Sequence, residues 1–193
     1  MNIFANFDVL YYLSHPRNKY HEQTLLEINT MMYLAELLSI YDGQKSSKWG
    51  YAFSRNKYGA PISAEIMSEI HLLCSKGIVD MDEKGYYHVA DNAEIEHISA
   101  LSSSNMMGWR TVYIDTVLDS LLTKPFPKVV SAVHNEPGIS LLNSVGRTSS
   151  LLDGNMINGL YDDFQALKDV INNPQAGLVV PASLWIDYLS VHE

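Results

Sequence analysis

Cysteine is nearly missing from this chain, since Cys74 is the single one among 193 residues. An internal disulfide is thereby excluded, and the usage fits a reducing compartment, because disulfide-stabilised domains belong to oxidising ones. Long apolar runs are missing as well, because none approaches the roughly 20 residues that span a bilayer. The first residues have no basic segment ahead of their apolar part, so no signal peptide is predicted. We expect a soluble, cytoplasmic protein without a membrane partner.

Positive charge is scarce beyond residue 60. Residues 1–60 hold six Lys/Arg and five Asp/Glu, a net charge of +1, whereas the remainder holds seven Lys/Arg and seventeen Asp/Glu, a net charge of −10. Binding to nucleic acid depends largely on cations that neutralise phosphates. The larger part of the chain is therefore a poor electrostatic match for DNA or RNA.

Catalytic motifs are also missing. The sequence contains no dinucleotide-binding glycine motif, Walker A loop, Gly-x-Ser-x-Gly elbow or His-Glu-x-x-His pair. His71 and Cys74 stand three residues apart and His88 follows, but the paired spacing of zinc ligands is absent. A buried cysteine beside a partly exposed histidine is the favoured interpretation. We expect no catalytic residue, no cofactor and no metal site, and hence a protein that is not an enzyme.

Helical periodicity is what the sequence has in abundance. The segment 21–43 gives the strongest signal, because Leu25, Ile28 and Met32 belong to a broad apolar face that is typical of a central core helix. A short helix is also expected to begin near Pro181. The other predicted helices cover residues 4–15, 64–77, 91–101, 109–122, 127–134 and 156–172.

Strand signals are short and lie in two places. Trp49, Tyr51 and Phe53 alternate with small residues, which predicts a short strand with the rings on one face. Residues 78–90 contain two short runs around a turn at 83–85, which predicts a hairpin. Helix, strand, helix and hairpin in this order resemble a winged helix.

The predicted fold class is therefore mainly α with a small β-hairpin (α+β). A winged-helix-like helical domain is expected over residues 1–102, and a C-terminal helical region over 109–193, with a linker near 102–108. The sequence leaves open whether the second region is a separate domain or packs as one unit with the first.

One basic cluster interrupts the acidic chain, and it contains Lys45, Lys48, Arg55 and Lys57. The favoured interpretation is that the aromatic residues between the cations pack into the core and leave the cations on a solvated rim, since period two suits a half-buried strand. The alternative is contact with nucleic acid or with an acidic partner protein, for which a stacking platform would need exposed rings.

The predicted recognition helix and wing lack matching cations. Between Pro61 and His97 there are two lysines and eight acidic residues, a net charge of −6. A winged helix that reads DNA places the helix before the wing in the major groove, where phosphate attraction requires positive charge. We therefore expect this helix not to read DNA.

The C-terminal part carries two apolar features. Residues 157–171 contain a stripe for which core packing is favoured over docking in a partner's groove. The tail after it is the stronger interface candidate, because a terminal segment this apolar needs a cover. Folding back onto its own domain and docking into another chain are both open. The candidate partner-binding residues of the tail are Val179, Val180, Leu184, Trp185 and Ile186.

A family resemblance rests on the stretch from Ile28 to Val79 and on VLYYLSHP near the start. The stretch combines a Tyr-Leu-Ala helix, a short aromatic strand, the turn KYGAPIS, an Ile/Leu helix and a Gly-Ile-Val exit. It resembles the helical winged-helix core of two bacterial groups. One is the Panacea (SocA-like) antitoxin domain, whose comparable YGP turn is one residue shorter than the turn at 58–61 here. The other is the middle component of ABC-three-component conflict systems, including Lamassu-type anti-phage defence.

The second group is the better match, because VLYYLSHP and an additional C-terminal helical part suit it. This resemblance implies a non-enzymatic adaptor between an SMC-like ABC ATPase and an effector such as a nuclease, with DNA reached only indirectly through the complex. The first group implies an antitoxin that neutralises a toxin by direct binding. A nucleic-acid-binding regulator is a further alternative.

Overall fold

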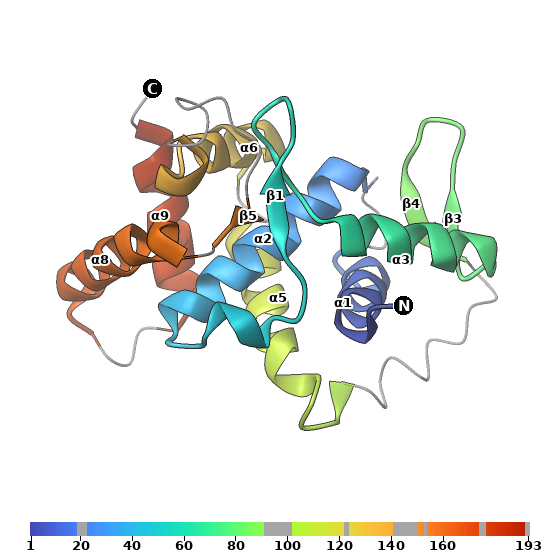
Figure 1. The fold of residues 1–193 in the computed structure, drawn as a ribbon, viewed down its shortest axis with the longest axis horizontal. Helices are drawn as coiled ribbons and strands as arrows, with labels where there is room; N and C mark the ends of the chain where they lie inside the picture. Colours follow the sequence, from blue (N-terminus) through green and yellow to red (C-terminus); the bar gives the residue numbers. More distant parts are fainter. Residues whose placement is uncertain are drawn as a thin grey trace.

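The structure is a computed structural model, and it describes residues 1–18, 23–90, 102–121, 124–140, 150–152, 154–173 and 177–191. Within these ranges the protein is mainly α-helical, with two small antiparallel sheets (Figure 1). The predicted fold class is confirmed. The helix predicted over 91–101 lies outside the described residues.

The N-terminal part has the order of a winged helix. Gln23, just before the second helix, forms an antiparallel bridge with Tyr87 in the last strand of the wing. The wing pairs its two strands antiparallel, with Val79 opposite Val89. Its elements are α1 (Ile3–Ser14), α2 (Leu25–Tyr41), α3 (Ala64–Ser75), β3 (Val79–Met81) and β4 (Tyr87–Val89).

Local sequence explains where the central helix begins and ends. Thr24 and Glu27 form a reciprocal capping box at the start of α2, which satisfies backbone N–H groups that have no partner within the helix. After Tyr41 the chain reaches Gly43, whose φ of 91° lies in the left-handed region that glycine adopts without strain. The helix is therefore fixed at both ends by local chemistry.

An insertion between α2 and α3 contains a second sheet. A short 3₁₀ turn, η1 (Ser46–Lys48), precedes β1 (Phe53–Arg55) and β2 (Pro61–Ile62), and β5 (Ser150–Leu151) pairs with the other edge of β1. The strand predicted from residue 49 thus begins only at Phe53. The segment before it bonds instead to the side chains of Asn2, which caps α1, and of Arg110 on α5.

The C-terminal helices complete the same core. One cluster of buried apolar residues extends from Ala5 in α1 to Leu189 in the last helix. In Figure 1 the wing and the C-terminal helices lie at opposite ends of the molecule, with α2 and α5 between them. The helices of this part are α5 (Gly108–Leu121), α6 (Phe126–His134), α8 (Gly154–Ile171) and α9 (Val179–Val191).

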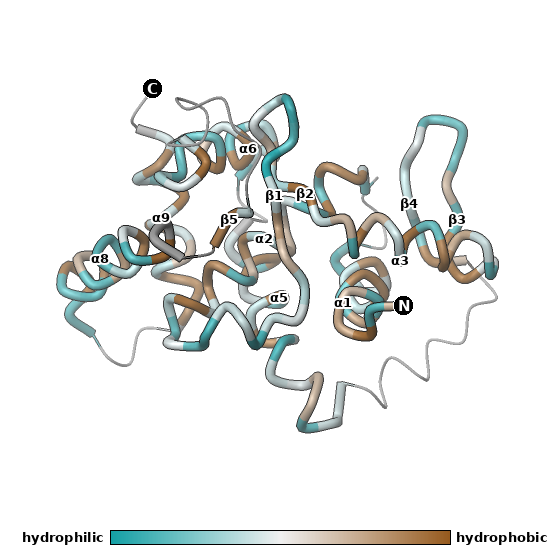
Figure 2. Tube along the Cα trace, viewed as in Figure 1, coloured by the Kyte–Doolittle hydropathy of each residue, from teal (hydrophilic) through white to brown (hydrophobic). Residues whose placement is uncertain are grey.

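Hydropathy along the chain follows this arrangement. Figure 2 shows the tip of the β3–β4 wing as hydrophilic and much of α2 and α9 as hydrophobic. The stripe predicted on the helix at 156–172 lies on α8 and packs into the protein core through Leu160 and Phe164, which are buried. No helix in the described part of the chain is both long and apolar enough to cross a membrane.

Candidate protein-interaction surfaces

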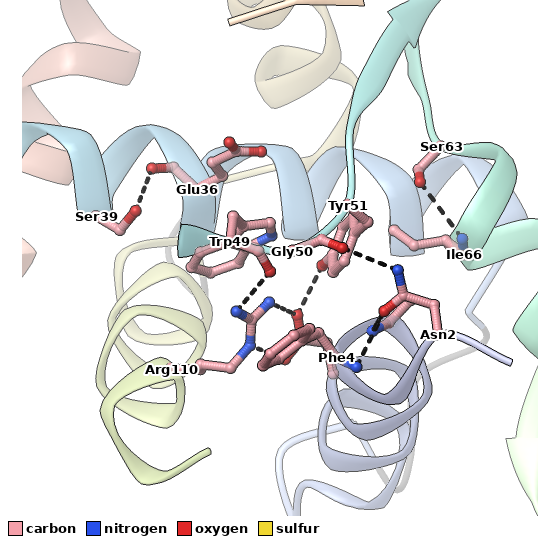
Figure 3. Close-up of polar contacts among 12 residues, drawn as sticks. Asn2, Phe4, Glu36, Ser39, Trp49, Gly50, Tyr51, Ser63, Ile66 and Arg110 are labelled. Atoms are coloured by element: carbon pink, nitrogen blue, oxygen red, sulfur yellow. Dashed lines mark hydrogen bonds and ion pairs between the residues drawn. The ribbon is translucent and has the colours of Figure 1, made fainter. Parts of the chain in front are cut away.

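A fully buried arginine lies where the two halves of the chain meet. The guanidinium of Arg110, on α5, donates from Nε to Asp8 Oδ1 at 2.8 Å and from Nη1 to the carbonyl oxygen of Trp49 at 2.8 Å. Its Nη2 also pairs with Asp8, whose side chain is fully buried too. A buried charge is tolerated when it is paired and hydrogen-bonded in this way. Figure 3 shows these contacts joining α1, α5 and the segment before β1.

Four aromatic rings surround the same guanidinium. The carbon Cζ of Arg110 lies 4.0 Å from the ring centroid of Trp49, with Phe4, Trp109 and Tyr51 at 5.2, 5.3 and 5.7 Å. The Tyr51 hydroxyl donates to Asp8 at 2.7 Å, and burial raises the pKa of Tyr51 well above its ordinary value. Cation–π attraction is strongest when the cation is desolvated, as here.

This centre fixes the backbone at Trp49 and Gly50, within residues 45–57, which we call the basic segment. Asn2 donates from Nδ2 to the carbonyl oxygen of Gly50 at 2.9 Å while its Oδ1 caps α1. Gly50 has a φ of 89°, and a Cβ atom there would overlap the ring of Phe4. Because Arg110 and Asp8 are closed to solvent, the centre positions elements and does not meet a ligand. Sequence reasoning missed both residues, although Asp8 is the only charged residue of α1 and Arg110 the only cation of α5.

The rings of the basic segment are core residues. Trp49, Tyr51 and Phe53 are 1, 7 and 1% exposed, and Phe53 packs edge-to-face on Tyr33 of α2 at 5.4 Å between centroids. The interpretation that these rings pack into the core is confirmed. A nucleic-acid stacking platform cannot be built from them, because such a platform needs exposed rings.

The cations of this segment do not form one patch. Lys45 and Lys48 are exposed beside η1, where Lys48 donates to Gln44 at 3.0 Å. Lys57 is exposed in the turn between β1 and β2 and lies over the ring of Tyr58, whereas Arg55 is half-buried. Figure 1 shows η1 and this turn beyond opposite ends of β1. The extended chain thus separates charges that look clustered in the sequence.

The helix before the wing is less acidic outside than its sequence suggests. Glu69 is buried and accepts hydrogen bonds from the backbone N–H of Asn2 and from Asn6 Nδ2, the latter at 3.0 Å. The exposed stripe of α3 is neutral, whereas the wing beyond it exposes three acids beside one lysine. The stripe contains Ala64, Ser68, His71 and Ser75, and the wing residues are Asp80, Asp82, Glu83 and Lys84.

The C-terminal helix has one buried and one exposed apolar face. Trp185 and Ile186, two of the predicted partner-binding residues, are 7 and 3% exposed and are buried within their own chain. The other three are exposed, and Tyr188 joins them, so that Val180, Leu184 and Tyr188 follow one another at the four-residue spacing of a helix face. We call the exposed residues Val179, Val180, Leu184 and Tyr188 the α9 stripe. The four-residue spacing from Leu184 could have identified Tyr188 as a member of this face from the sequence alone.

The helix that carries the α9 stripe is firmly held. Trp185 packs edge-to-face on Phe164 of α8 at 5.1 Å between centroids. Asp187 accepts a hydrogen bond from Lys124 Nζ at 2.6 Å, and this bond lowers the pKa of the Asp187 carboxyl. Asn135 at the end of α6 donates to the carbonyl oxygen of Leu189 at 3.0 Å. The stripe is thus presented on a fixed element.

Two hollows in the described part of the chain differ in size and shape. One, lined by Met1, Ala64 and Glu69 among others, has a volume of about 390 Å³ but is a shallow depression open to solvent. The other, an apolar pocket between α2, α5, α8 and α9 that is lined by Leu38, Phe164 and Ala182 among others, has a volume of about 30 Å³. Ligand pockets hold several hundred cubic ångströms, so this one is too small for a metabolite. Among the described residues, no group of three or more His, Cys, Asp or Glu is arranged to hold a metal ion.

Comparisons with family models, curated proteins and solved structures found no match to this chain.

Proposed function

We propose that this chain is a cytoplasmic, non-enzymatic adaptor subunit that links an SMC-like ABC ATPase to an effector, such as a nuclease, in a bacterial anti-phage defence complex. The main support for the adaptor role is the α9 stripe, an exposed apolar surface. The helix that presents it is held on its other face by the contacts of Trp185 and Asp187. The class of partner comes from the resemblance of residues 28–79 to the middle components of ABC-three-component systems.

The physical argument for docking is the cost of exposed apolar surface. Val179, Val180, Leu184 and Tyr188 are 40, 44, 41 and 54% exposed. Transfer of apolar area out of water is favourable by roughly 25 cal/mol per Å², and this gain works against the entropy lost on association. Residues at this spacing are the anchors that a groove or a second helix accepts. The stripe is therefore suited to a protein partner.

The charge distribution favours DNA contact only through the complex. The exposed stripe of α3 has no Lys or Arg, and the wing tip is acidic. Phosphate neutralisation supplies most of the affinity of non-specific DNA binding, so a winged helix with this surface is better suited to a protein than to a duplex.

Co-expression with the genes that flank this chain tests the proposal. We expect an affinity-tagged chain to recover a long ABC ATPase and an effector, and Leu184→Glu to lose at least one of them. Val170→Glu is the matched control, because Val170 is 78% exposed on α8, outside the stripe. Recovery of a single small toxin would favour the Panacea-type antitoxin instead. Failure to recover any stable complex would contradict both.

A further inference from the structure

A second acidic side chain is buried next to the Arg110 centre, on the other side of the buried Trp49 ring from Arg110 (Figure 3). Glu36, on α2, is 1% exposed, and its Oε1 accepts a hydrogen bond from Ser46 Oγ at 2.7 Å. Its Oε2 has no hydrogen-bond partner among the described residues, and neither has the buried Nε1 of Trp49. Figure 3 shows the Glu36 carboxyl beside α2 and the Trp49 indole beneath it. The carboxyl thus has one protein partner, and that partner belongs to η1.

Glu36 has no positively charged hydrogen-bond partner among the described residues of this region. Arg110 on α5 is the nearby cation, and both of its contacts to a carboxylate go to Asp8 on α1. Tyr33, on the same helix as Glu36, donates its hydroxyl to Glu136 at 3.0 Å and contributes no positive charge. An ionised Glu36 would therefore add an unpaired negative charge to a closed interior, which is strongly unfavourable.

The proton affinity of the group agrees with this geometry. Burial raises the pKa of Glu36 to about 8, although the Ser46 hydrogen bond and the charge of Arg110 lower it and the charge of Asp8 raises it. The carboxyl is thus neutral at pH 7 and ionises in the mildly alkaline range.

We propose that Glu36 is a proton-controlled latch for the turn from Lys45 to Lys48, which precedes the fixed residue Trp49. As the neutral acid it remains in its buried site and holds the turn through Ser46. On ionisation the carboxylate needs water, and the turn is the element that yields. The reason is that the residues around Glu36 on α2 belong to the core, whereas Lys45, Ser47 and Lys48 are already exposed. Deprotonation therefore releases the turn and frees its two lysines.

Limited proteolysis of the isolated chain tests the latch. Trypsin cuts after Lys45 and Lys48 when the turn opens, and cleavage after Lys57 and Lys84, which lie in other turns, normalises for the protease's own pH response. A group with a pKa of about 8 is roughly 10% ionised at pH 7 and 90% at pH 9. We expect the normalised cleavage, followed by mass spectrometry, to rise about ninefold over this range.

Variants separate Glu36 from other causes. Glu36→Gln should abolish the rise, and Glu83→Gln, at an exposed acid of the wing, should leave it unchanged. If Glu36→Gln does not fold, carbon-13 NMR of the unmodified chain decides, provided that the glutamate carboxyls are assigned, since burial also raises the pKa of Glu136 and the Glu36 resonance itself should titrate near pH 8. A constant cleavage ratio, a rise that persists in Glu36→Gln, or the absence of any such resonance would overturn the latch. Any consequence for partner binding rests on the proposed adaptor function, but the latch itself is measured without a partner.

Discussion

At the scale of residues, Arg110 connects parts of the sequence that are far apart. It is separated by 102 positions from Asp8 and by 61 from Trp49, yet it binds both. The pair with Asp8 is not a large source of stability, because two charges must leave water to form it. Its importance is geometric, since a bidentate guanidinium accepts few other arrangements.

Removal of one partner of this pair is expected to be severe. Arg110→Met leaves Asp8 buried and charged, so the free energy of unfolding should fall by about 3–5 kcal/mol, as measured by urea denaturation. The double variant Asp8→Asn/Arg110→Met removes the orphaned charge and should be more stable than Arg110→Met alone. Equal stability of the single and double variants would contradict this account of the centre.

The buried acid Glu36 predicts a particular dependence of stability on pH. Its pKa in the folded chain, about 8, lies above the ordinary value of 4.5, so the native state keeps a proton that the unfolded chain has lost. The resulting stabilisation is complete below about pH 4.5 and is lost as the pH rises towards 8. Glu36→Gln has no such loss. We expect the melting temperature of Glu36→Gln minus that of the unmodified chain to increase from pH 5 to 8 and then level off; a constant difference would contradict the assignment.

At the scale of elements, α9 separates a structural face from an exposed one. Trp185 is buried against Phe164, and truncation of a buried aromatic residue typically costs 3–5 kcal/mol. Trp185→Ala should therefore lower the free energy of unfolding by about that amount in chemical denaturation. Leu184→Glu, one position away on the exposed face, should change it by no more than about 0.5 kcal/mol. Comparable losses for the two variants would show that the α9 stripe is structural.

Sequence periodicity predicted the elements that local chemistry determines. The helices expected at 109–122 and 127–134 begin and end within one residue of α5 and α6. The alternation from Trp49 to Phe53 predicted correctly which rings are buried. It did not predict that β1 begins only at Phe53, because the hydrogen bond of the Trp49 carbonyl goes to a side chain 61 positions away. No local pattern contains that information.

The interaction surfaces were predictable only in part, for the same reason. The tail was recognised as an apolar segment, but its sequence could not say that Trp185 faces inward and Leu184 outward until the contact with Phe164 fixed the rotation of the helix. Likewise Glu69 counts toward the negative charge of its segment in the sequence. In the fold its carboxylate is buried and accepts hydrogen bonds from Asn2 and Asn6, so it does not contribute to the exposed surface.

At the scale of the whole molecule, the surface that a DNA-reading winged helix would use combines an uncharged helix stripe with a wing that exposes more acids than lysines. The described residues of α3 and the wing place no cation on the exposed helix stripe. We expect the isolated chain to bind a duplex of 25 base pairs no more tightly than about 10⁻⁴ M at physiological salt, the weak end of non-specific binding, in fluorescence anisotropy. Tighter binding that falls steeply with salt, and that weakens when Lys45, Lys48, Arg55 and Lys57 are neutralised, would favour a nucleic-acid regulator.

The continuous core bears on how force would travel through the molecule. Within the described residues, α9 packs on α5, and α1 packs on both α5 and α3. The bond between Arg110 and Asp8 also ties α5 to α1. Packed interiors have low compressibility and transmit strain. A load applied to α9 should therefore also displace the distant hairpin, because within the described residues a continuous apolar core connects the two.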